Sequence, residues 1–262
     1  MKKLLLLSFV FTTISLSSFA WWGQTGHRVV GEIADAYISN KTRKAIREIL
    51  GFESIAMGSN WADFIKSDTS YNYLGSWHYI NVKQGLSQTE FNDILAKDTA
   101  TDAYTKLNFL ITELKNKQLP ADKKQMYLRL LIHIVGDIHQ PLHVGRLEDL
   151  GGNRVRVLWF GDSTNLHSVW DEKMIESQKL SYTEYAKAIN SCSKEQRNFW
   201  QHQSINEWFF ESYQAAGKIY SGVTQPNQRL SFRYSFDYID MLNSQLLKGG
   251  VRLAGLLNSI FG

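Results

Sequence analysis

The sequence predicts an all-α fold, mainly helical, with one small β-hairpin. Three observations lead to this class: capping signals precede several segments, apolar residues recur at intervals of three and four, and a single short segment alternates apolar with polar residues. The 262-residue chain contains only three prolines, and it has no internal repeat, Pro/Ser-rich linker or block of like charge. We therefore expect one domain over residues 21–262.

Capping residues mark the start of several predicted helices. A serine or threonine followed three residues later by glutamate is the spacing of a capping box, in which each side chain bonds the other residue's backbone amide. A glycine after the last apolar residue is typical of a helix end. These signals stand at Ser39 or Asn40 before Lys41 to Leu50, which would end at Gly51, at Ser87 with Glu90, and at Ser181 with Glu184.

Two further helices are predicted by apolar spacing, and one segment by alternation. The helical spacing is seen in Leu107, Leu110, Ile111 and Leu114, and again in Tyr127, Leu130, Leu131, Ile134 and Val135. Residues Asn153 to Phe160 alternate between Gly151-Gly152 and Gly161-Asp162, which indicates a strand or hairpin attached to the helices.

The first twenty residues have the pattern of a secretory signal peptide. Lys2 and Lys3 form a charged start, Leu4 to Phe11 an apolar stretch, and small residues precede a cleavage site after Ala20. The apolar stretch is far shorter than the roughly 20 residues that a membrane span needs, which disfavours a retained anchor. We expect a soluble, secreted or periplasmic monomer.

The net charge and the cysteine count exclude some modes of nucleic-acid binding and of stabilisation. There are 29 Lys and Arg against 25 Asp and Glu, a net charge of +4, which excludes a global cationic field that binds duplex nucleic acid non-specifically. Any polyanion must be held by local features. The one cysteine, Cys192, cannot form an intramolecular disulfide, so an exported protein would need another source of stability. Bound metal could supply it.

Histidine and aspartate residues carry the functional signal. His133 and Asp137 stand four apart on a predicted helix, hence on one face, and Pro141 is expected to stop that helix before His143. His167 and Asp171 repeat the spacing. One such pair is commonly a surface ion pair. Two pairs beside apolar residues favour a metal site, because imidazole and carboxylate suit zinc and buried charge needs neutralisation.

Two other histidines receive different interpretations. His139 could orient a metal ligand through a hydrogen bond, while His202 is expected at the surface.

Several ordered motifs make the sequence resemble the S1/P1 nuclease family, the zinc-dependent single-strand-specific nucleases. The resemblance covers nearly all of residues 21–262. It rests on Trp22-Gly-Gln-Thr-Gly-His27, Asn60-Trp-Ala-Asp63, Trp77-His78-Tyr79, the block from His133 to His143, and Asn165-Leu-His167 to Asp171. The family fold is mainly α-helical, of the phospholipase C/P1 nuclease type, with a small β element.

The resemblance implies nine ligands and three zinc ions. It assigns Asp63, His78, His133 and Asp137 to one zinc, His143, His167 and Asp171 to a second, and Trp22, His27 and a bridging Asp137 to a third. In the family the first tryptophan binds through its amino group and carbonyl. The spacing from Trp22 to His27 matches the family, whereas cleavage after Ala20 would make Trp21 the new terminus.

The implied activity is hydrolysis of phosphodiester bonds in single-stranded DNA and RNA to leave 5′-phosphate ends; action on 3′-nucleotides is left open. Asp63 and Asp137 serve the metals and Lys66 adds positive charge, although many relatives have arginine at that position. Tyr79 is a candidate stacking platform for a base, with core packing as the alternative. Asn81 is a candidate substrate contact, where fungal relatives have aspartate.

Two competing functions use similar residues. A zinc phospholipase C has a related site, but its last carboxylate is typically glutamate, where this chain has Asp171, and its spacing after the first tryptophan is longer. A purely structural zinc protein needs every position closed by protein ligands. His143, His167 and Asp171 make only three, which favours an enzyme.

Overall fold

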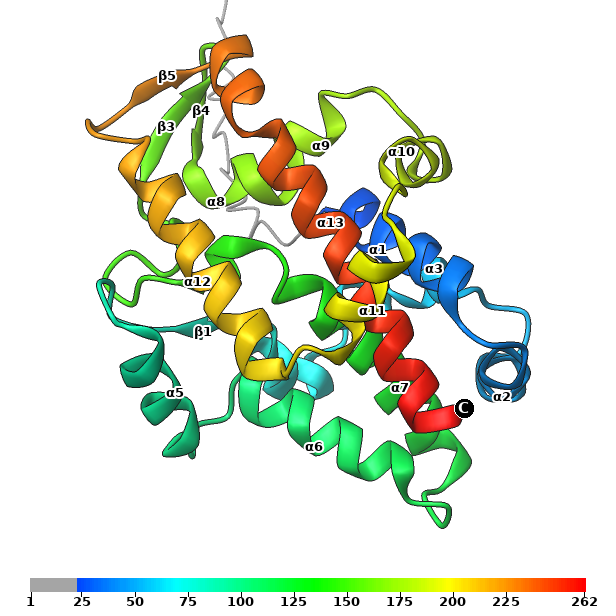
Figure 1. The fold of residues 1–262 in the computed structure, drawn as a ribbon. Coiled ribbons are helices and arrows are strands. Elements are labelled where there is room, and N and C mark those ends of the chain that lie inside the picture. The colour runs from blue at the N-terminus through cyan, green and yellow to red at the C-terminus, as the bar shows by residue number, and fades with distance from the viewer. Residues whose placement is uncertain (1–22) are drawn as a thin grey trace, which may run out of the picture.

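The computed structural model describes residues 23–262, so the predicted leader, Trp21 and Trp22 lie outside the described residues. Helices dominate the described chain, which confirms the predicted all-α class. The long C-terminal helix α13 (Phe232–Phe261) runs across the molecule and packs on α1 (Gln24–Tyr37), and α1 in turn contacts α7 (Ala121–Asp137) (Figure 1). These three helices form the centre of the fold.

Shorter helices surround this centre. The other α-helices are α2 (Asn40–Leu50), α3 (Ile55–Gly58), α4 (Trp61–Phe64), α5 (Gln88–Ala96), α6 (Ala103–Lys115), α8 (Leu166–Ser168), α9 (Met174–Glu176), α10 (Tyr182–Ile189), α11 (Lys194–His202) and α12 (Ile205–Ser221). Three 3₁₀-helices and one π-helical turn complete them: η1 (Ile65–Ser67), η2 (Thr69–His78), η3 (Pro141–His143) and the π-turn η4 (Val169–Lys173). None of the helices within residues 23–262 is long and apolar enough to cross a bilayer.

The predicted capping signals are confirmed. The Ser39 hydroxyl accepts a hydrogen bond from the Thr42 amide at 3.1 Å, so α2 begins at Asn40, and Gly51 ends it with a φ of +70°. Both predicted capping boxes are present, at Ser87 with Glu90 before α5 and at Ser181 with Glu184 before α10.

The second half of α7 is buried on every side. Its residues from Leu130 to Asp137 are all buried, because α1, α3, α4, α6 and α13 pack around it. A helix that is covered all round carries its polar residues into the interior, which is how His133 and Asp137 become buried. The helix ends at Asp137, before the stop predicted at Pro141, and Pro141 instead begins the 3₁₀ turn η3.

The predicted hairpin is present and belongs to a three-stranded sheet. β3 (Arg156–Trp159) pairs antiparallel with β4 (Asp162–Asn165), with Arg156 opposite Asn165. A third strand, β5 (Gln228–Leu230), runs parallel to β3 on its other side. A separate pair, β1 (Ile80–Asn81) and β2 (Val144–Gly145), is parallel. The strands β1, β2 and β5 were not predicted from the sequence, because they have only two or three residues each and form through long-range pairing.

Candidate metal centre

Eight of the nine predicted ligands lie together in the described chain. The ninth, Trp22, lies outside the described residues, but the amide of Gly23 donates to the Asp171 carbonyl at 2.6 Å. The described chain therefore begins beside the cluster. Asp63 is half-buried and the other seven are buried. The eight are His27 on α1, Asp63 on α4, His78 on η2, His133 and Asp137 on α7, His143 on η3, His167 on α8 and Asp171 on η4.

Asp137 is at the middle of this cluster. Its Oδ2 lies 2.9 Å from His78 Nδ1 and 3.1 Å from His133 Nε2. Its Oδ1 lies 3.2 Å from His143 Nδ1 and 3.4 Å from His27 Nε2. One carboxylate thus contacts four imidazoles from four different elements, the arrangement expected of a ligand shared between metal ions.

A second carboxylate, Asp171, organises the other side of the cluster. Its Oδ2 lies 3.0 Å from His167 Nε2, and its Oδ1 lies 3.3 Å from His143 Nε2. The imidazoles of His143 and His167 are stacked, with ring centroids 5.0 Å apart. His167 and Asp171 share a face as predicted, although α8 continues into a π-helical turn rather than a regular α-helix. Such turns are frequent at functional sites.

Three groups have ligand atoms close enough to hold a metal ion, within 4.8 Å of one another. The group implied for the second zinc forms as expected. Asp63 Oδ1 lies 3.6 Å from His133 Nε2, which agrees with their assignment to the same zinc ion. Asp63 also lies close to His27, which the resemblance assigns to a different zinc ion. The sets therefore adjoin and share members. The groups are His27, Asp63 and His133; His78, His133 and Asp137; and His143, His167 and Asp171.

Backbone carbonyls hold several of the imidazoles. A carbonyl that accepts from Nδ1–H fixes the tautomer in which Nε2 carries the lone pair, and Nε2 can then bind a metal. In each of the three cases below, Nε2 faces a carboxylate of the cluster. The contacts are His133 Nδ1 to the Ser59 carbonyl at 2.6 Å, His143 Nδ1 to the His78 carbonyl at 2.8 Å, and His167 Nδ1 to the Gly151 carbonyl at 2.7 Å.

Two glycines make this geometry possible. A Cβ at Gly136 would lie 2.5 Å from Nδ1 of His27, so glycine there lets α1 bring His27 onto α7. Gly151 has a φ of +62°, and a Cβ on it would lie 2.3 Å from the Leu142 carbonyl oxygen. Glycine is favoured in such a conformation, and the turn that it forms presents the carbonyl that holds His167.

The cluster strongly shifts the pKa values of its members. Burial opposes ionisation of Asp137, but the surrounding imidazoles, His133 foremost, hold the pKa of Asp137 well below its ordinary value. Burial also opposes the charged form of His143, yet the carboxylates of Asp137 and Asp171 raise the pKa of His143 to about 9. Burial lowers the pKa of His78 to about 4. The carboxylates are thus held as anions in the interior.

The donor set fits metal ions. Asp137 Oδ1, His143 Nε2 and Asp171 Oδ2 are buried and make no hydrogen bond of normal geometry within residues 23–262. Buried polar atoms are rarely left without one. Imidazole nitrogens and carboxylate oxygens converging in a buried site are the ligands that zinc and similar cations prefer. The structure therefore supports a centre for several metal ions.

Two predicted accessory residues lie at the rim. Lys66 Nζ donates to Asp63 Oδ1 at 2.6 Å, so its charge lies next to the cluster. Burial lowers the pKa of Lys66 to about 8, although Asp63 opposes that shift. The side chain of Tyr79 is 41% exposed, so the alternative of core packing is wrong for this residue.

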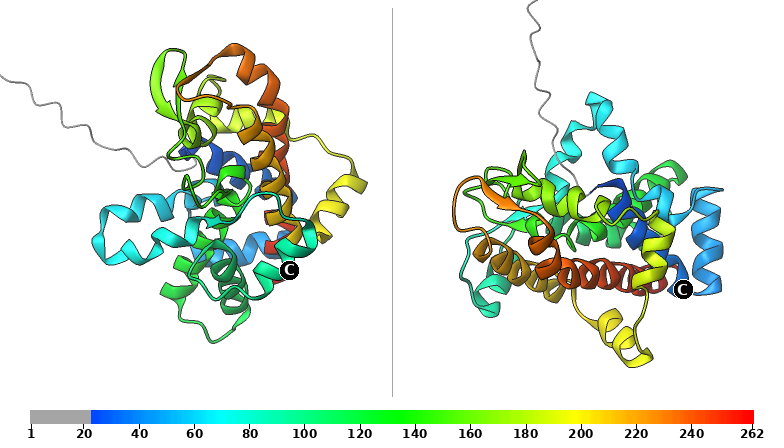
Figure 2. Two further views of the ribbon diagram at one scale, coloured as in Figure 1. Left: turned by 90° about the vertical axis from the view of Figure 1, so that its left-hand side faces the viewer. Right: turned by 90° about the horizontal axis from the view of Figure 1, so that it is seen from above.

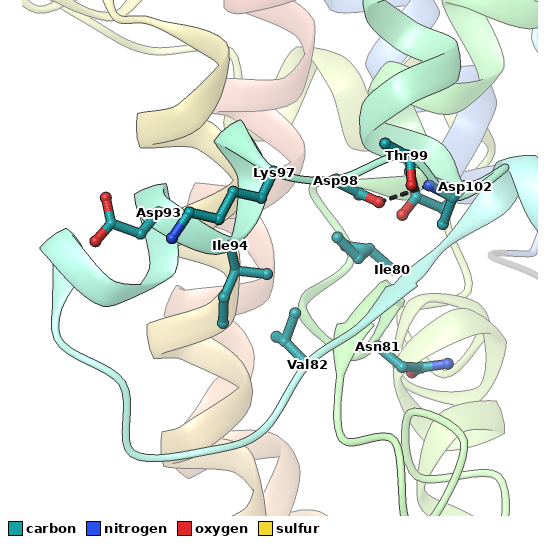
Figure 3. A pocket seen from close by; sticks show the side chains of 10 residues that line it. Ile80, Asn81, Val82, Asp93, Ile94, Lys97, Asp98, Thr99 and Asp102 are labelled. Carbon is teal, nitrogen blue, oxygen red and sulfur yellow. Dashed lines mark hydrogen bonds between the residues drawn. The ribbon is translucent and has the colours of Figure 1, made fainter.

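Asn81 lies on β1, beside a pocket of about 560 Å³. Ile80 and Val82 point toward this pocket, and Asn81 points the other way (Figure 3). Its Oδ1 would lie 3.6 Å from a Cβ on Gly151, next to the turn that holds His167. Asn81 therefore neighbours the metal centre through that turn.

The interpretation of His139 as a residue that orients a metal ligand is wrong. His139 is buried, its Nδ1 donates to the Val135 carbonyl at 2.7 Å, and its Nε2 accepts from Arg252 at 3.0 Å. It lies two residues after Asp137 in the sequence, and the turn of the chain directs it to α13 instead. His202 is exposed, as predicted.

Gln140 is a site residue that the sequence analysis missed. It is fully buried, its side-chain amide donates to Asp171 Oδ1, and its Oε1 accepts from the Leu142 amide at 2.6 Å. It links the segment that carries His143 to the turn that carries Asp171. Its position inside the histidine block was the only signal for this role.

Several known proteins are similar to this chain in sequence. Residues 22–262 match the family described as S1/P1 Nuclease. Endonuclease 2 from Arabidopsis thaliana is 30% identical over 92% of this chain and 91% of its own length. Endonuclease 3 from the same organism is 28% identical over 99% and 95%. Nuclease S1 from Aspergillus oryzae is 30% identical over 68% and 63%. The chain therefore belongs to the S1/P1 nuclease family.

Proposed function

We propose that this protein is a zinc-dependent endonuclease that hydrolyses phosphodiester bonds in single-stranded DNA and RNA and leaves 5′-phosphate ends. The observation that carries the proposal is the set of three adjoining His/Asp groups, in which His133 belongs to two groups and Asp137 contacts four imidazoles. Family membership over residues 22–262 supports the same reaction class.

The proposed cofactor is about three zinc ions per chain. Their ligands would be Asp63, His78, His133 and Asp137; His143, His167 and Asp171; and Trp22, His27 and Asp137. Bound zinc supplies positive charge to phosphate oxygens and makes water acidic enough to serve as a nucleophile near neutral pH.

The chain's own residues position the substrate and the charges. The anionic state of Asp137 and Asp171 follows from the imidazoles around them, so both are ready to bind cations. Lys66 projects an ammonium group beside Asp63, where it can stabilise the negative charge that grows on phosphate during attack. Tyr79, exposed and adjacent to His78, can stack on an unpaired base without reading its identity.

Single strands are the preferred substrate in this proposal. The metal centre is buried except at Asp63, which is half-buried. A flexible single strand can bend to reach the centre while its bases stack on aromatic side chains. A regular duplex keeps its bases paired and is stiffer. The net charge of +4 is also too small to attract duplex generally.

The deciding experiment is an assay of purified protein, with and without a chelator, on four substrates: single-stranded DNA, RNA, duplex DNA and phosphatidylcholine. We expect metal-dependent cleavage of single-stranded DNA and RNA, with slower cleavage of duplex DNA. Hydrolysis of phosphatidylcholine in place of nucleic acid would instead establish the phospholipase C alternative. Equal rates on single and double strands would refute the strand preference.

We also propose that the protein is exported and that its leader is removed, which raises the question of which residue becomes the N-terminus. Processing after Ala20 leaves Trp21 at the terminus, whereas the family spacing requires the amine of Trp22. N-terminal sequencing of the exported protein identifies the residue, and zinc counts for chains that begin at Met1, Trp21 and Trp22 test the amine as a ligand. Equal zinc content and activity in all three would show that the amine does not bind zinc.

A further inference from the structure

A projecting segment, here called the aromatic arm, joins two ligands of the metal centre. The arm comprises residues 64–77, and it runs from Asp63 to His78 through η1 and most of η2. Figure 2 shows this part of the chain, in cyan, standing out from the other helices in both views. Because both of its ends are fixed in the metal centre, the arm rises directly from the rim of the site.

Aromatic rings form a continuous series from the start of α4 along the arm. Trp61 and Tyr71 are in contact edge to face with centroids 5.8 Å apart, and Tyr71 stacks with Tyr73 at 6.3 Å. Tyr73 contacts Trp77 at 5.9 Å, and Trp77 contacts Phe109 on α6 at 6.4 Å. The series therefore connects the α4 helix that carries Asp63 with the outer surface of α6.

The outer side of the arm combines exposed aromatic rings with small polar groups. Phe64 is 76% exposed and Tyr73 is 53% exposed, while Leu74 is completely buried. The arm's other exposed residues are Ser67, Asp68, Thr69, Ser70 and Asn72. No aliphatic side chain is exposed on the arm. Such a surface, in which exposed rings are flanked by polar groups, suits the flat faces and polar edges of unpaired bases.

Charge also favours a phosphate-bearing partner. Lys106 on α6 places its ammonium group 5.1 Å from the centre of the Trp77 ring and 5.4 Å from that of Phe109. The acidic group of the arm, Asp68, accepts hydrogen bonds from the amide and hydroxyl of Ser70, so its carboxylate is engaged within its own turn. Aromatic rings interleaved with lysine are typical of surfaces that bind single-stranded nucleic acid.

We propose that the aromatic arm binds unpaired bases of the substrate strand beyond the nucleotide that is cleaved, with Phe64 and Tyr73 as stacking platforms. The proposal rests on the proposed nuclease function and extends it from a single scissile bond to a stretch of strand. It predicts that affinity rises with substrate length. Because Tyr73 stands five residues before His78 along η2, we expect cleavage of a dinucleotide not to depend on it.

The test compares Tyr73→Ala with Tyr73→Trp and with Phe199→Ala, a control on α11 whose ring is 63% exposed. The metal-loaded protein is titrated with a fluorescently labelled 20-residue phosphorothioate oligothymidylate, and Kd is measured by anisotropy. We expect Tyr73→Ala to raise Kd about fivefold, equivalent to about 1 kcal/mol. Tyr73→Trp should restore tight binding, and Phe199→Ala should leave Kd unchanged. Adding Phe64→Ala should raise Kd further.

A second measurement separates this proposal from the proposed function. For Tyr73→Ala, kcat/KM for the dinucleotide TpT should equal that of the wild type. An unchanged Kd for the 20-residue strand would overturn the arm proposal and leave the nuclease function intact. Equal losses on the dinucleotide and the long strand would also overturn it, since the residue would then support the centre itself. Loss of binding to phosphatidylcholine vesicles, without loss of oligonucleotide binding, would identify a membrane surface instead. If Tyr73 controls oligonucleotide binding but no nucleic acid is cleaved, the arm is a single-strand binding surface and the nuclease function fails.

Discussion

Two clusters of polar side chains in the interior contact the segment that follows α7, and their charges are balanced in different ways. One is the metal centre around Asp137. The other, here called the Arg252 cluster, consists of Arg252, Glu211, Lys248, His139 and Gln203. In the Arg252 cluster the chain supplies its own cations, since Arg252 and Lys248 both bond to Glu211. In the metal centre three carboxylates gather with Lys66 and imidazoles, and two buried oxygens, Asp137 Oδ1 and Asp171 Oδ2, have no hydrogen bond of normal geometry to any residue that the structure describes.

The difference shows which cluster requires an external cation. Burial opposes ionisation of Glu211, but Arg252 and Lys248 lower its pKa, so that cluster is electrostatically complete within the chain. Burial and the neighbouring Arg252 lower the pKa of His139 to about 3, which keeps it neutral between Arg252 and the Val135 carbonyl. In the metal centre Asp137 and Asp171 are completely buried, whereas Glu211 is partly exposed, and the centre has fewer fixed positive charges. Its stability should therefore depend on metal, while that of the Arg252 cluster should not.

Metal removal should have the largest effect. A chelator should extract about three zinc ions, abolish activity and lower Tm, because the buried carboxylates lose their counter-charge. Elemental analysis, activity and thermal unfolding measure the three outcomes together. Re-addition of zinc should restore all of them. A fully active, equally stable protein without any divalent metal would contradict the assignment of this cluster as a metal centre.

Asp137→Asn should be the most damaging single substitution at the centre. It keeps the shape but removes the charge that contacts four imidazoles, so kcat/KM should fall by more than the roughly 10- to 100-fold typical of losing a residue that only supports a ligand. Zinc content should fall by more than one ion, since Asp137 is assigned to two. His202→Ala, at an exposed site, is the matched control and should change neither quantity. Similar small effects in both variants would argue against the bridging role.

Arg252→Met should damage stability and leave the metal centre loaded. Arg252 is completely buried and bonds to Glu211, Gln203 and His139, so its loss leaves Glu211 with Lys248 alone. The free energy of unfolding should fall by about 3 kcal/mol, the lower end for breaking a buried pair, because Glu211 is partly exposed. Urea unfolding at fixed zinc concentration measures it.

The control lies on the same helix. Arg233 pairs with Asp237 at 2.9 Å, and the arginine side chain is 82% exposed, so Arg233→Met should cost less than about 1 kcal/mol. If Arg252→Met also released zinc, the two clusters would not be independent, and the metal centre would depend on the charges of the Arg252 cluster.

Local sequence patterns predicted the features that depend on neighbouring residues of one helix. The spacing of His133 and Asp137 placed both on one face of α7, and serine caps placed the starts of α2, α5 and α10. The meeting of Asp63 with His133 depends on packing between α4 and α7, and only the family resemblance implied it. Because no local pattern records a contact across more than a hundred residues, the partnership of His139 with Arg252 was missed and His139 was misinterpreted.

Among the substitutions within the two clusters, Gln140→Met should have the smallest effect, and it should separate the two halves of the metal centre. Along one short segment, Asp137 and His143 face the centre, His139 faces Arg252, and Gln140 holds Asp171 by a side-chain hydrogen bond. Methionine has a similar length but cannot donate that hydrogen bond. The substitution therefore removes a restraint on the orientation of Asp171 without removing any metal ligand. The affinity of the His143, His167 and Asp171 group for zinc should fall by about 10- to 100-fold. Competition with a graded series of chelators should show one zinc ion leaving earlier than in the wild type and the other two leaving unchanged. Gln140→Glu, which replaces the donor by an anion beside Asp171, should weaken the same ion further. Earlier loss of all three ions would mean that Gln140 supports the whole segment rather than Asp171 alone.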